Sequence, residues 1–177
     1  MGGRVAVLVG DLTQQQVSVI VNAANSSLMG GGGVDGAIHD AGGPNILEAC
    51  KRIRKELFPE GLPAGEAVIT TAGNLAAQYV IHTVGPIYGR HAGREAELLA
   101  SCYQNSLRLA AKLSLPSIAF AAISTGVFGF PKAEAAEVSS EAIQACLKSE
   151  ERISEVRLVF FHPRDAQIFL EHQKFSG

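Results

Sequence analysis

Apolar residues along the chain form two patterns, which alternate from one end to the other. Short runs rich in β-branched residues are typical of strands, and they occur at 5–9, 17–21, 67–71, 79–84, 117–123 and 156–161. Apolar positions spaced three and four apart predict helices over 34–41, 44–57, 95–113, 132–147 and 164–174. This alternation predicts one three-layer α/β/α domain over residues 1–177, with a mostly parallel, mixed central sheet.

In a sheet of this kind, ligands bind in the loops that follow the carboxyl ends of the strands. Three such loops combine glycine with small polar residues, and they cover residues 10–13, 22–33 and 124–131. These loops are therefore the place to look for a binding or catalytic site.

The glycine run in the second loop matches the sequence pattern of dinucleotide-binding loops but not the position after a strand that this pattern requires. Gly31, Gly33 and Gly36 satisfy the pattern G-x-G-x-x-G, which needs its first glycine directly after a strand. Here the strand is predicted to end near Val21 or Asn22, well before the glycines. No Gly-Lys-Ser/Thr follows the run either, so a Walker-type loop is also disfavoured.

Two of the loops lead directly into predicted helices, which suggests a different phosphate site. One helix is predicted to start right after the glycine run, and Pro131 opens another after the third loop. Backbone N–H groups at helix starts bind anions, so the two loops can enclose a pyrophosphate. Neither loop contains Lys or Arg, and amide dipoles would then meet the phosphate charge. The alternative is a mobile surface loop.

Several side chains near these loops have the chemistry to bind a nucleotide sugar. Asn22 and Asn25 offer donors and acceptors for sugar hydroxyls, although each can instead form an Asx turn. Asp11 can accept a proton from an exocyclic amine, or it can simply cap a turn. Asp35 and His39 are four residues apart and share one helix face, and the alternative for His39 is an ordinary surface histidine.

Composition narrows the class of protein. Apolar residues make up 47% of the 177 residues, and the formal net charge is -2. An acidic balance disfavours binding to nucleic acid or to an anionic membrane. The three cysteines show no Cys-x-x-Cys spacing, so neither a metal site nor a disulfide framework is expected. A reducing, cytoplasmic compartment and a chain without a signal peptide are the expectations.

Five motifs occur in order over nearly the whole chain, namely Gly10-Asp11-Leu12-Thr13, Val19 to Ser26, Gly30 to Ile38, Tyr79 to Pro86 and Ile123 to Phe130. They resemble those of the macrodomain family. The closest resemblance is to its MacroD-like hydrolases, which include O-acetyl-ADP-ribose deacetylases.

The resemblance implies a pocket for ADP-ribose. Asp11 would bind the adenine amine beside the Leu12 backbone, and Phe161 would stack on the adenine ring. Asn25 would hold the distal ribose, with Phe128 packed over it. The loops that would enclose the diphosphate consist of Gly32, Gly33, Val34, Asp35 and Gly36, and of Ser124, Thr125, Gly126, Val127, Phe128 and Gly129.

The activity implied is hydrolysis of acyl esters of ADP-ribose, with neither a metal nor a cofactor. Substrates would include O-acetyl-ADP-ribose and mono-ADP-ribose on Asp or Glu side chains of proteins. Asp35, or the substrate's own phosphate, would orient or deprotonate water, while His39 would support Asp35 or bind the acyl part. The alternative is a module that binds ADP-ribose without cleaving it.

Three residues depart from the family pattern. Phe128 stands where many members have tyrosine, so that hydroxyl is missing. Leu12 replaces the commoner isoleucine, a mild change because its backbone would make the contact. His162 stands where many relatives carry an acidic residue, and contacts at the adenine edge are expected to differ.

Overall fold

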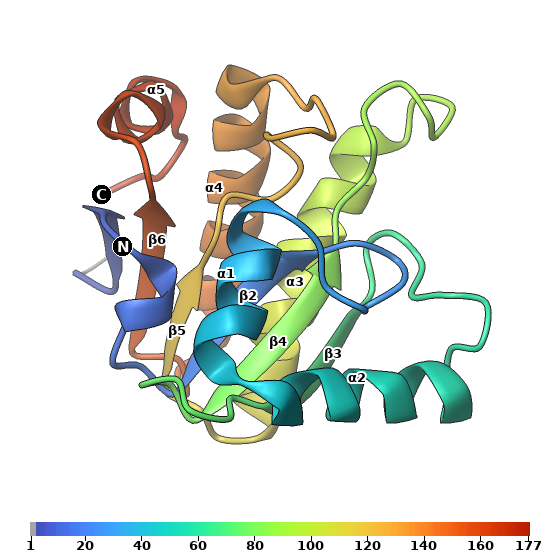
Figure 1. Cartoon of the computed structure of the whole chain (residues 1–177). Helices are drawn as coiled ribbons and strands as arrows, with labels where there is room; N and C mark the ends of the chain where they lie inside the picture. The colour runs from blue at the N-terminus through green and yellow to red at the C-terminus, as the bar shows by residue number, and fades with distance from the viewer. Residues whose placement is uncertain (1–2) are drawn as a thin grey trace.

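A computed structural model describes residues 3–177, and it contains a six-stranded sheet flanked by helices (Figure 1). The strands are β1 (Val5–Val9), β2 (Val19–Ala24), β3 (Ala67–Thr71), β4 (Tyr79–Val84), β5 (Ser117–Phe120) and β6 (Glu155–Phe160). The helices are α1 (Gly33–Gly42), α2 (Pro44–Glu56), α3 (Glu95–Lys112), α4 (Lys132–Ser149) and α5 (Pro163–His172), with a 3-10 turn, η1, at Leu12–Gln14. No helix within the described residues has the length and apolarity needed to cross a membrane.

The strands lie in the order β1-β6-β5-β2-β4-β3. All neighbouring pairs are parallel except β3 and β4, which run antiparallel. The predicted mostly parallel, mixed sheet is therefore confirmed. Because five strands share one direction, the loops after β1, β2, β4, β5 and β6 meet at one edge of the sheet.

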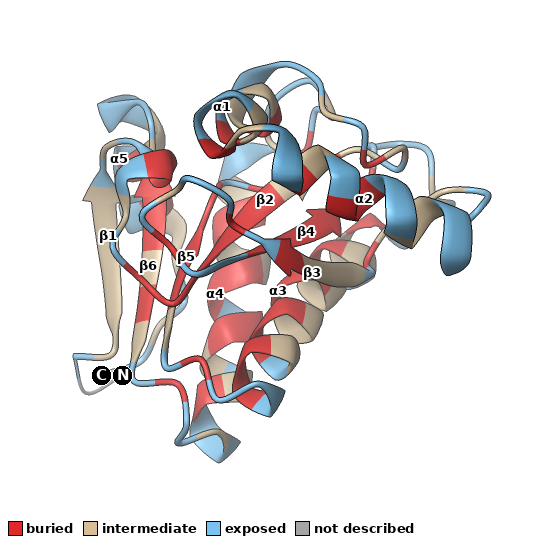
Figure 2. Cartoon of the chain, turned by 60° about the horizontal axis from the view of Figure 1, so that its bottom comes forward, coloured by how far each residue is buried: buried red, intermediate tan, exposed pale blue. Residues whose placement is uncertain are grey.

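Helices cover both faces of the sheet and give the predicted three layers (Figure 1). On one face, Ile38 of α1 and Ile46 of α2 pack against Ile20 and Val80 of the central strands. On the other face, α3, α4 and α5 bury the larger core. Figure 2 shows the buried positions concentrated in the middle strands and along the inner sides of α3 and α4.

Two strands end more than one residue away from prediction at the edge where the loops gather. The expectation that the second strand ends near Val21 or Asn22 is wrong, because β2 continues to Ala24 by pairing residue for residue with β4. The fifth strand ends earlier than predicted, at Phe120, and the chain then turns through Ser124 at a φ of 66°. β2 is extended by its register with β4, and β5 ends where its pairing with β2 and β6 ends. Local composition encodes neither register.

Ile118 provides a test of this packing, because it is fully buried in β5 between β2 and β6. We expect Ile118→Ala to lower the free energy of unfolding by about 2–5 kcal/mol, because it leaves a cavity that the sheet cannot close. Urea unfolding measures this loss. Leu57→Ala, at a largely exposed site, is the control and should change stability by less than about 0.5 kcal/mol. Equal effects of both variants would contradict the assigned core.

Candidate functional site

A cleft of about 420 Å³ opens at the carboxyl ends of β2, β4 and β5, within the range typical of small-molecule sites. Its walls are Ala23, Ala24, Asn25, Gly31, Gly32, Gly33, Val34, Asp35, Gly85, Ala122, Ser124, Gly126, Val127 and Phe128. The structure thus brings the glycine run and the third loop together, as expected for loops at one edge of the sheet.

The amino end of α1 forms one wall of the cleft. Gly32 is the N-cap residue, and no side chain caps this end of the helix. Free N–H groups at such an end attract negative charge, and the helix dipole adds to the effect. Asp35 is the one charged residue among the cleft walls. Backbone amides, and no lysine or arginine, are thus the groups available to meet an anion.

Asp35 lies in the first turn of α1, and the residue is only 5% exposed. Its Oδ1 accepts a hydrogen bond of 2.8 Å from the Asn22 side-chain amide. The His39 Nε2 atom lies 3.5 Å from the same oxygen. The prediction that Asp35 and His39 share one helix face is confirmed, and Asn22 of β2 holds the carboxylate from the side of the sheet.

Asn25 is half-buried and held in one orientation by its own loop. Its amide donates to the Gly30 carbonyl oxygen at 3.0 Å, and its Oδ1 accepts from the Ser27 backbone N–H at 3.1 Å. A Cβ on Gly31 would lie 3.2 Å from Asn25 Nδ2 and 3.4 Å from Asp35 Oδ2. Gly31 therefore lies next to both side chains, and a side chain at this position would crowd them.

The third loop is held by the segment that follows β4. Ser124 has a left-handed φ of 66°, and its hydroxyl donates to the Pro86 carbonyl at 2.8 Å. The Tyr88 N–H donates to the Phe128 carbonyl at 2.8 Å. With these bonds in place, Phe128 lines the same cleft as the glycine run.

The loops after β1 and β6 lie side by side, because the Gly10 N–H donates to the Phe160 carbonyl at 2.9 Å. Asp11 caps η1 by accepting from the Thr13 N–H at 2.9 Å and from the Thr13 hydroxyl at 2.7 Å. Phe161 follows the end of β6 and is 75% exposed, whereas Leu12 is buried. These predicted adenine contacts form a separate surface outside the cleft walls.

Comparison with known proteins agrees with this arrangement. The Macro domain family model matches residues 21–139. A macro domain-containing protein in non 5'region from Streptomyces griseus is 53% identical over 165 residues, covering 93% of this chain and 90% of that protein. An O-acetyl-ADP-ribose deacetylase from Escherichia fergusonii is 49% identical, covering 96% and 94%.

A mutant of the Oceanobacillus iheyensis macrodomain, solved with ADPR, superposes with a TM-score of 0.92 at 46% identity, covering 95% of this chain and 90% of that one. The chain belongs to the macrodomain family.

One predicted ligand contact of this macrodomain is wrong. Asn22 is 0% exposed, and it lies beneath Asp35 within β2 and not on the surface of the cleft. Because β2 extends beyond Asn22, the side chain points into the layer between the sheet and α1. There it donates to Asp35 and cannot reach a sugar hydroxyl.

Three other predicted contacts are not among the cleft walls. A Cβ on Gly36 would lie 2.4 Å from the Gly31 carbonyl oxygen, so Gly36 lets the glycine loop pack against α1. Gly129 closes a turn at a φ of 74° by donating to Gly126. Thr125 borders a second cavity between β5, β6, α4 and α5.

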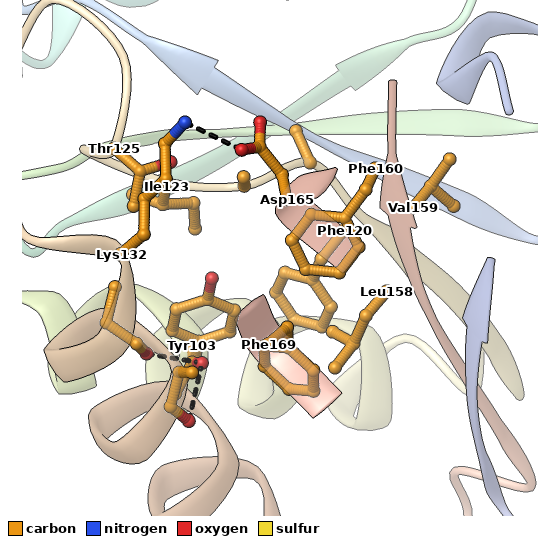
Figure 3. A pocket seen from close by; sticks show the side chains of 15 residues that line it. Tyr103, Phe120, Ile123, Thr125, Lys132, Leu158, Val159, Phe160, Asp165 and Phe169 are labelled. Atoms are coloured by element: carbon orange, nitrogen blue, oxygen red, sulfur yellow. Dashed lines mark hydrogen bonds and ion pairs between the residues drawn. The ribbon is translucent and has the colours of Figure 1, made fainter. Parts of the chain in front are cut away.

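Figure 3 shows this second cavity, where the Lys132 ammonium and the Asp165 carboxylate pair at 2.6 Å near Thr125. Aromatic rings of Tyr103, Phe120 and Phe169 line its interior. Burial raises the pKa of Tyr103. A volume of about 30 Å³ holds a single water molecule and no nucleotide, so this cavity is not the candidate site.

Sequence reasoning missed a buried polar group under Asp35. The ligand atoms of His39, Cys50 and His82 come within 4.8 Å of one another. Both His82 nitrogens already contact other partners, Asn22 Nδ2 at 3.1 Å and Thr70 Oγ1 at 2.9 Å. Burial raises the pKa of the Cys50 thiol to about 11, which opposes a metal-binding thiolate. Within the group Cys50 Sγ contacts His82 Nε2 at 3.8 Å, whereas His39 Nε2 is buried without a hydrogen bond among the described residues. The three residues are therefore better described as buried polar packing around His82 than as a metal site. The one available signal was a histidine inside an apolar strand.

His82 gives the macrodomain a predictable dependence of stability on pH. Burial, with His39 as a second cause, lowers the His82 pKa from 6.5 to about 3. Between these values the unfolded chain binds the proton and the folded chain does not. The free energy of unfolding should therefore fall as pH decreases from 6.5 toward 3, by up to about 1.4 kcal/mol per pH unit from this residue.

Urea unfolding between about pH 4 and pH 7 measures this slope, and His82→Asn should show a shallower one. Nuclear magnetic resonance of the wild-type His82 ring provides a second measurement, because the ring should stay neutral throughout that range. A His82 ring that becomes protonated near pH 6.5 would contradict the assignment.

Proposed function

We propose that this macrodomain binds ADP-ribose and hydrolyses its acyl esters. Substrates would be O-acetyl-ADP-ribose and mono-ADP-ribose attached to Asp or Glu side chains. The observation that carries the proposal is the pair formed by Asp35 and Asn25 next to Gly31, in a cleft that offers amide dipoles to an anion. Relatives bearing the deacetylase name, and the ADPR bound to a similar fold, support it.

The proposed ligand is extended, and its parts would meet different loops at the same edge of the sheet. Adenine would lie on Phe161 with its amine at Asp11, since their loops are joined by the Gly10–Phe160 hydrogen bond. The diphosphate would lie between the glycine run and the loop 124–129, facing the open end of α1. The distal ribose would meet Asn25, whose amide has a second hydrogen beyond the one given to Gly30.

Hydrolysis adds water across the ester bond and releases ADP-ribose and a carboxylic acid. Asp35 would orient the water and take its proton, either alone or with the substrate's phosphate. Its burial and its hydrogen bond from Asn22 hold the carboxylate in place. Asn25 would fix the sugar so that the reacting carbon faces the water. His39, 3.5 Å from Asp35, would support the carboxylate or contact the acyl group.

We also propose that the protein works in the cytoplasm and removes mono-ADP-ribose from modified proteins there. All three cysteines are free thiols, and Cys50 and Cys102 are buried, which is compatible with a reducing compartment.

The deciding experiment measures release of ADP-ribose from O-acetyl-ADP-ribose and from a protein carrying mono-ADP-ribosyl-glutamate. Calorimetry with ADP-ribose runs in parallel. Binding with hydrolysis supports the proposal. Binding without hydrolysis of either substrate would identify a non-catalytic reader of ADP-ribose. No binding would overturn both functions.

Substitution of the two central residues should separate catalysis from binding. We expect Asp35→Ala to lower kcat by about 100-fold or more, because the water loses the group that orients and deprotonates it. Asn25→Ala should lower kcat more than it weakens the Kd for ADP-ribose. Asp40→Ala, which removes an exposed carboxylate from the same helix, is the matched control. An unchanged kcat in Asp35→Ala would contradict the catalytic role assigned to Asp35.

Gly36→Ala tests the diphosphate cradle from a position that is not itself a cleft wall. Its Cβ would meet the Gly31 carbonyl at 2.4 Å, so the glycine loop must move. Overpacking of this kind costs about 1–3 kcal/mol, and the Kd for ADP-ribose should rise by about fivefold to 100-fold. Calorimetry measures the change, and Ala37→Ser at an exposed position of α1 serves as control. Unaltered affinity in Gly36→Ala would show that the loop does not hold the diphosphate.

A further inference from the structure

A continuous line of hydrogen bonds runs from the edge of the sheet to Asp35. The Thr70 hydroxyl donates to the Thr71 carbonyl at 2.9 Å and contacts His82 Nε2 at 2.9 Å. His82 Nδ1 lies 3.1 Å from the amide nitrogen of Asn22, which donates to Asp35 Oδ1 at 2.8 Å. The line crosses three adjacent strands, β3, β4 and β2, and ends in the first turn of α1.

Strand pairing brings these residues together. Asn22 and His82 are direct partners in the parallel pair of β2 and β4. Val68 is opposite His82 in the antiparallel pair of β4 and β3, and Thr70 lies two residues further on the same face. All four polar side chains are at least nine-tenths buried, so water does not compete for their hydrogen bonds.

Only one assignment of protons satisfies the whole line. The Thr70 hydrogen points to the Thr71 carbonyl, so the Thr70 oxygen is an acceptor and His82 Nε2 carries the proton. His82 Nδ1 is then an acceptor for Asn22. The Asn22 amide nitrogen, with two hydrogens, donates one to His82 and one to Asp35. Each donor in the line therefore faces an acceptor.

The Asn22 amide depends on this assignment for its orientation. Its Oδ1 atom is buried and makes no hydrogen bond within residues 3–177. Contacts of the amide nitrogen alone therefore decide which way the group faces. If His82 carried its proton on Nδ1, the amide would turn its oxygen toward the ring. That oxygen would then face the Asp35 carboxylate and repel it.

We propose that His82 and Thr70 are positioning residues for the hydrolysis, which act through Asn22 to hold Asp35 in its reactive orientation. The proposal rests on the proposed function of the cleft. Neither residue contacts the ligand: His82 and Thr70 are both absent from the cleft walls. The lowered pKa of His82 agrees with this role, because an imidazolium could not accept from Asn22.

The first test reads the His82 tautomer in the wild-type protein. Long-range ¹H–¹⁵N correlation of the histidine rings distinguishes a proton on Nε2 from one on Nδ1. We expect the Nε2–H form of neutral His82 at pH 7. The Nδ1–H form would overturn the proposal, whatever the enzymatic activity.

The second test compares two substitutions of Thr70 that differ in the hydroxyl. Thr70→Val keeps the shape and removes the acceptor for His82, whereas Thr70→Ser keeps the acceptor. We expect Thr70→Val to lower kcat for O-acetyl-ADP-ribose by about fivefold to tenfold, as one lost hydrogen bond implies, while KM and the Kd for ADP-ribose stay the same. Thr70→Ser should restore most of kcat.

Thr83→Val is the matched control. Thr83 is also fully buried in the sheet, and its hydroxyl donates to the Glu66 carbonyl at 2.8 Å. Thr83→Val therefore removes a buried threonine hydrogen bond that is not connected to Asp35. We expect a comparable fall in thermal stability and an unchanged kcat. Equal falls in kcat for Thr70→Val and Thr83→Val, or no fall for Thr70→Val, would overturn the proposal.

The outcomes separate this proposal from the proposed function. If the wild-type protein binds ADP-ribose but hydrolyses neither substrate, the proposed hydrolysis is wrong, and the positioning role is wrong with it. If the wild-type enzyme is active and Thr70→Val keeps full kcat, only the positioning role is wrong.

Discussion

The hydrogen bond between Asn22 and Asp35 is the interaction on which the geometry of the cleft depends. It joins the sheet to the first turn of α1, and both residues are almost completely buried. A buried carboxylate without such a donor would bear the full cost of desolvation. Because α1 begins only two residues before Asp35, the bond that holds Asp35 also fixes the free N–H groups at the start of the helix. The hydrogen bond from Asn22 therefore positions both the Asp35 carboxylate and the proposed anion site.

No lysine or arginine lines the cleft, so an anionic ligand would be bound by backbone amides. This limits the reactions that the cleft can catalyse. Phosphoryl transfer enzymes add lysine, arginine or magnesium to stabilise charge on the phosphate. A helix start and glycine amides can hold a diphosphate without activating it. The bond to be cleaved would then lie beyond the diphosphate, beside Asn25 and Asp35. The absence of a side chain at Gly31 keeps that region open, and the packing of Gly36 against the Gly31 carbonyl keeps the loop close to α1.

The buried polar residues show where reasoning from the sequence stops. Asn22 looks like a loop residue, because it follows an apolar run and precedes small residues. In the structure it belongs to β2, and its side-chain amide contacts Asp35 and His82 inside the protein. His82 lies inside a correctly predicted strand, yet its partner Asn22 is sixty residues away in the chain. Thr70 and Cys50 come from two further elements. No local pattern links these four positions.

The sequence by itself determined the layers, the nearly parallel sheet and the loops that would carry the site. These follow from the spacing of apolar residues, which is a local property because each helix or strand must present one face to the core. Only the tertiary structure decided which polar residues of those loops face the cleft and which lie beneath it. That choice depends on strand register, since the pairing of β2 with β4 places Asn22 opposite His82, where its amide contacts both His82 and Asp35. Register is set by pairing between distant segments, and a single sequence carries no direct record of it.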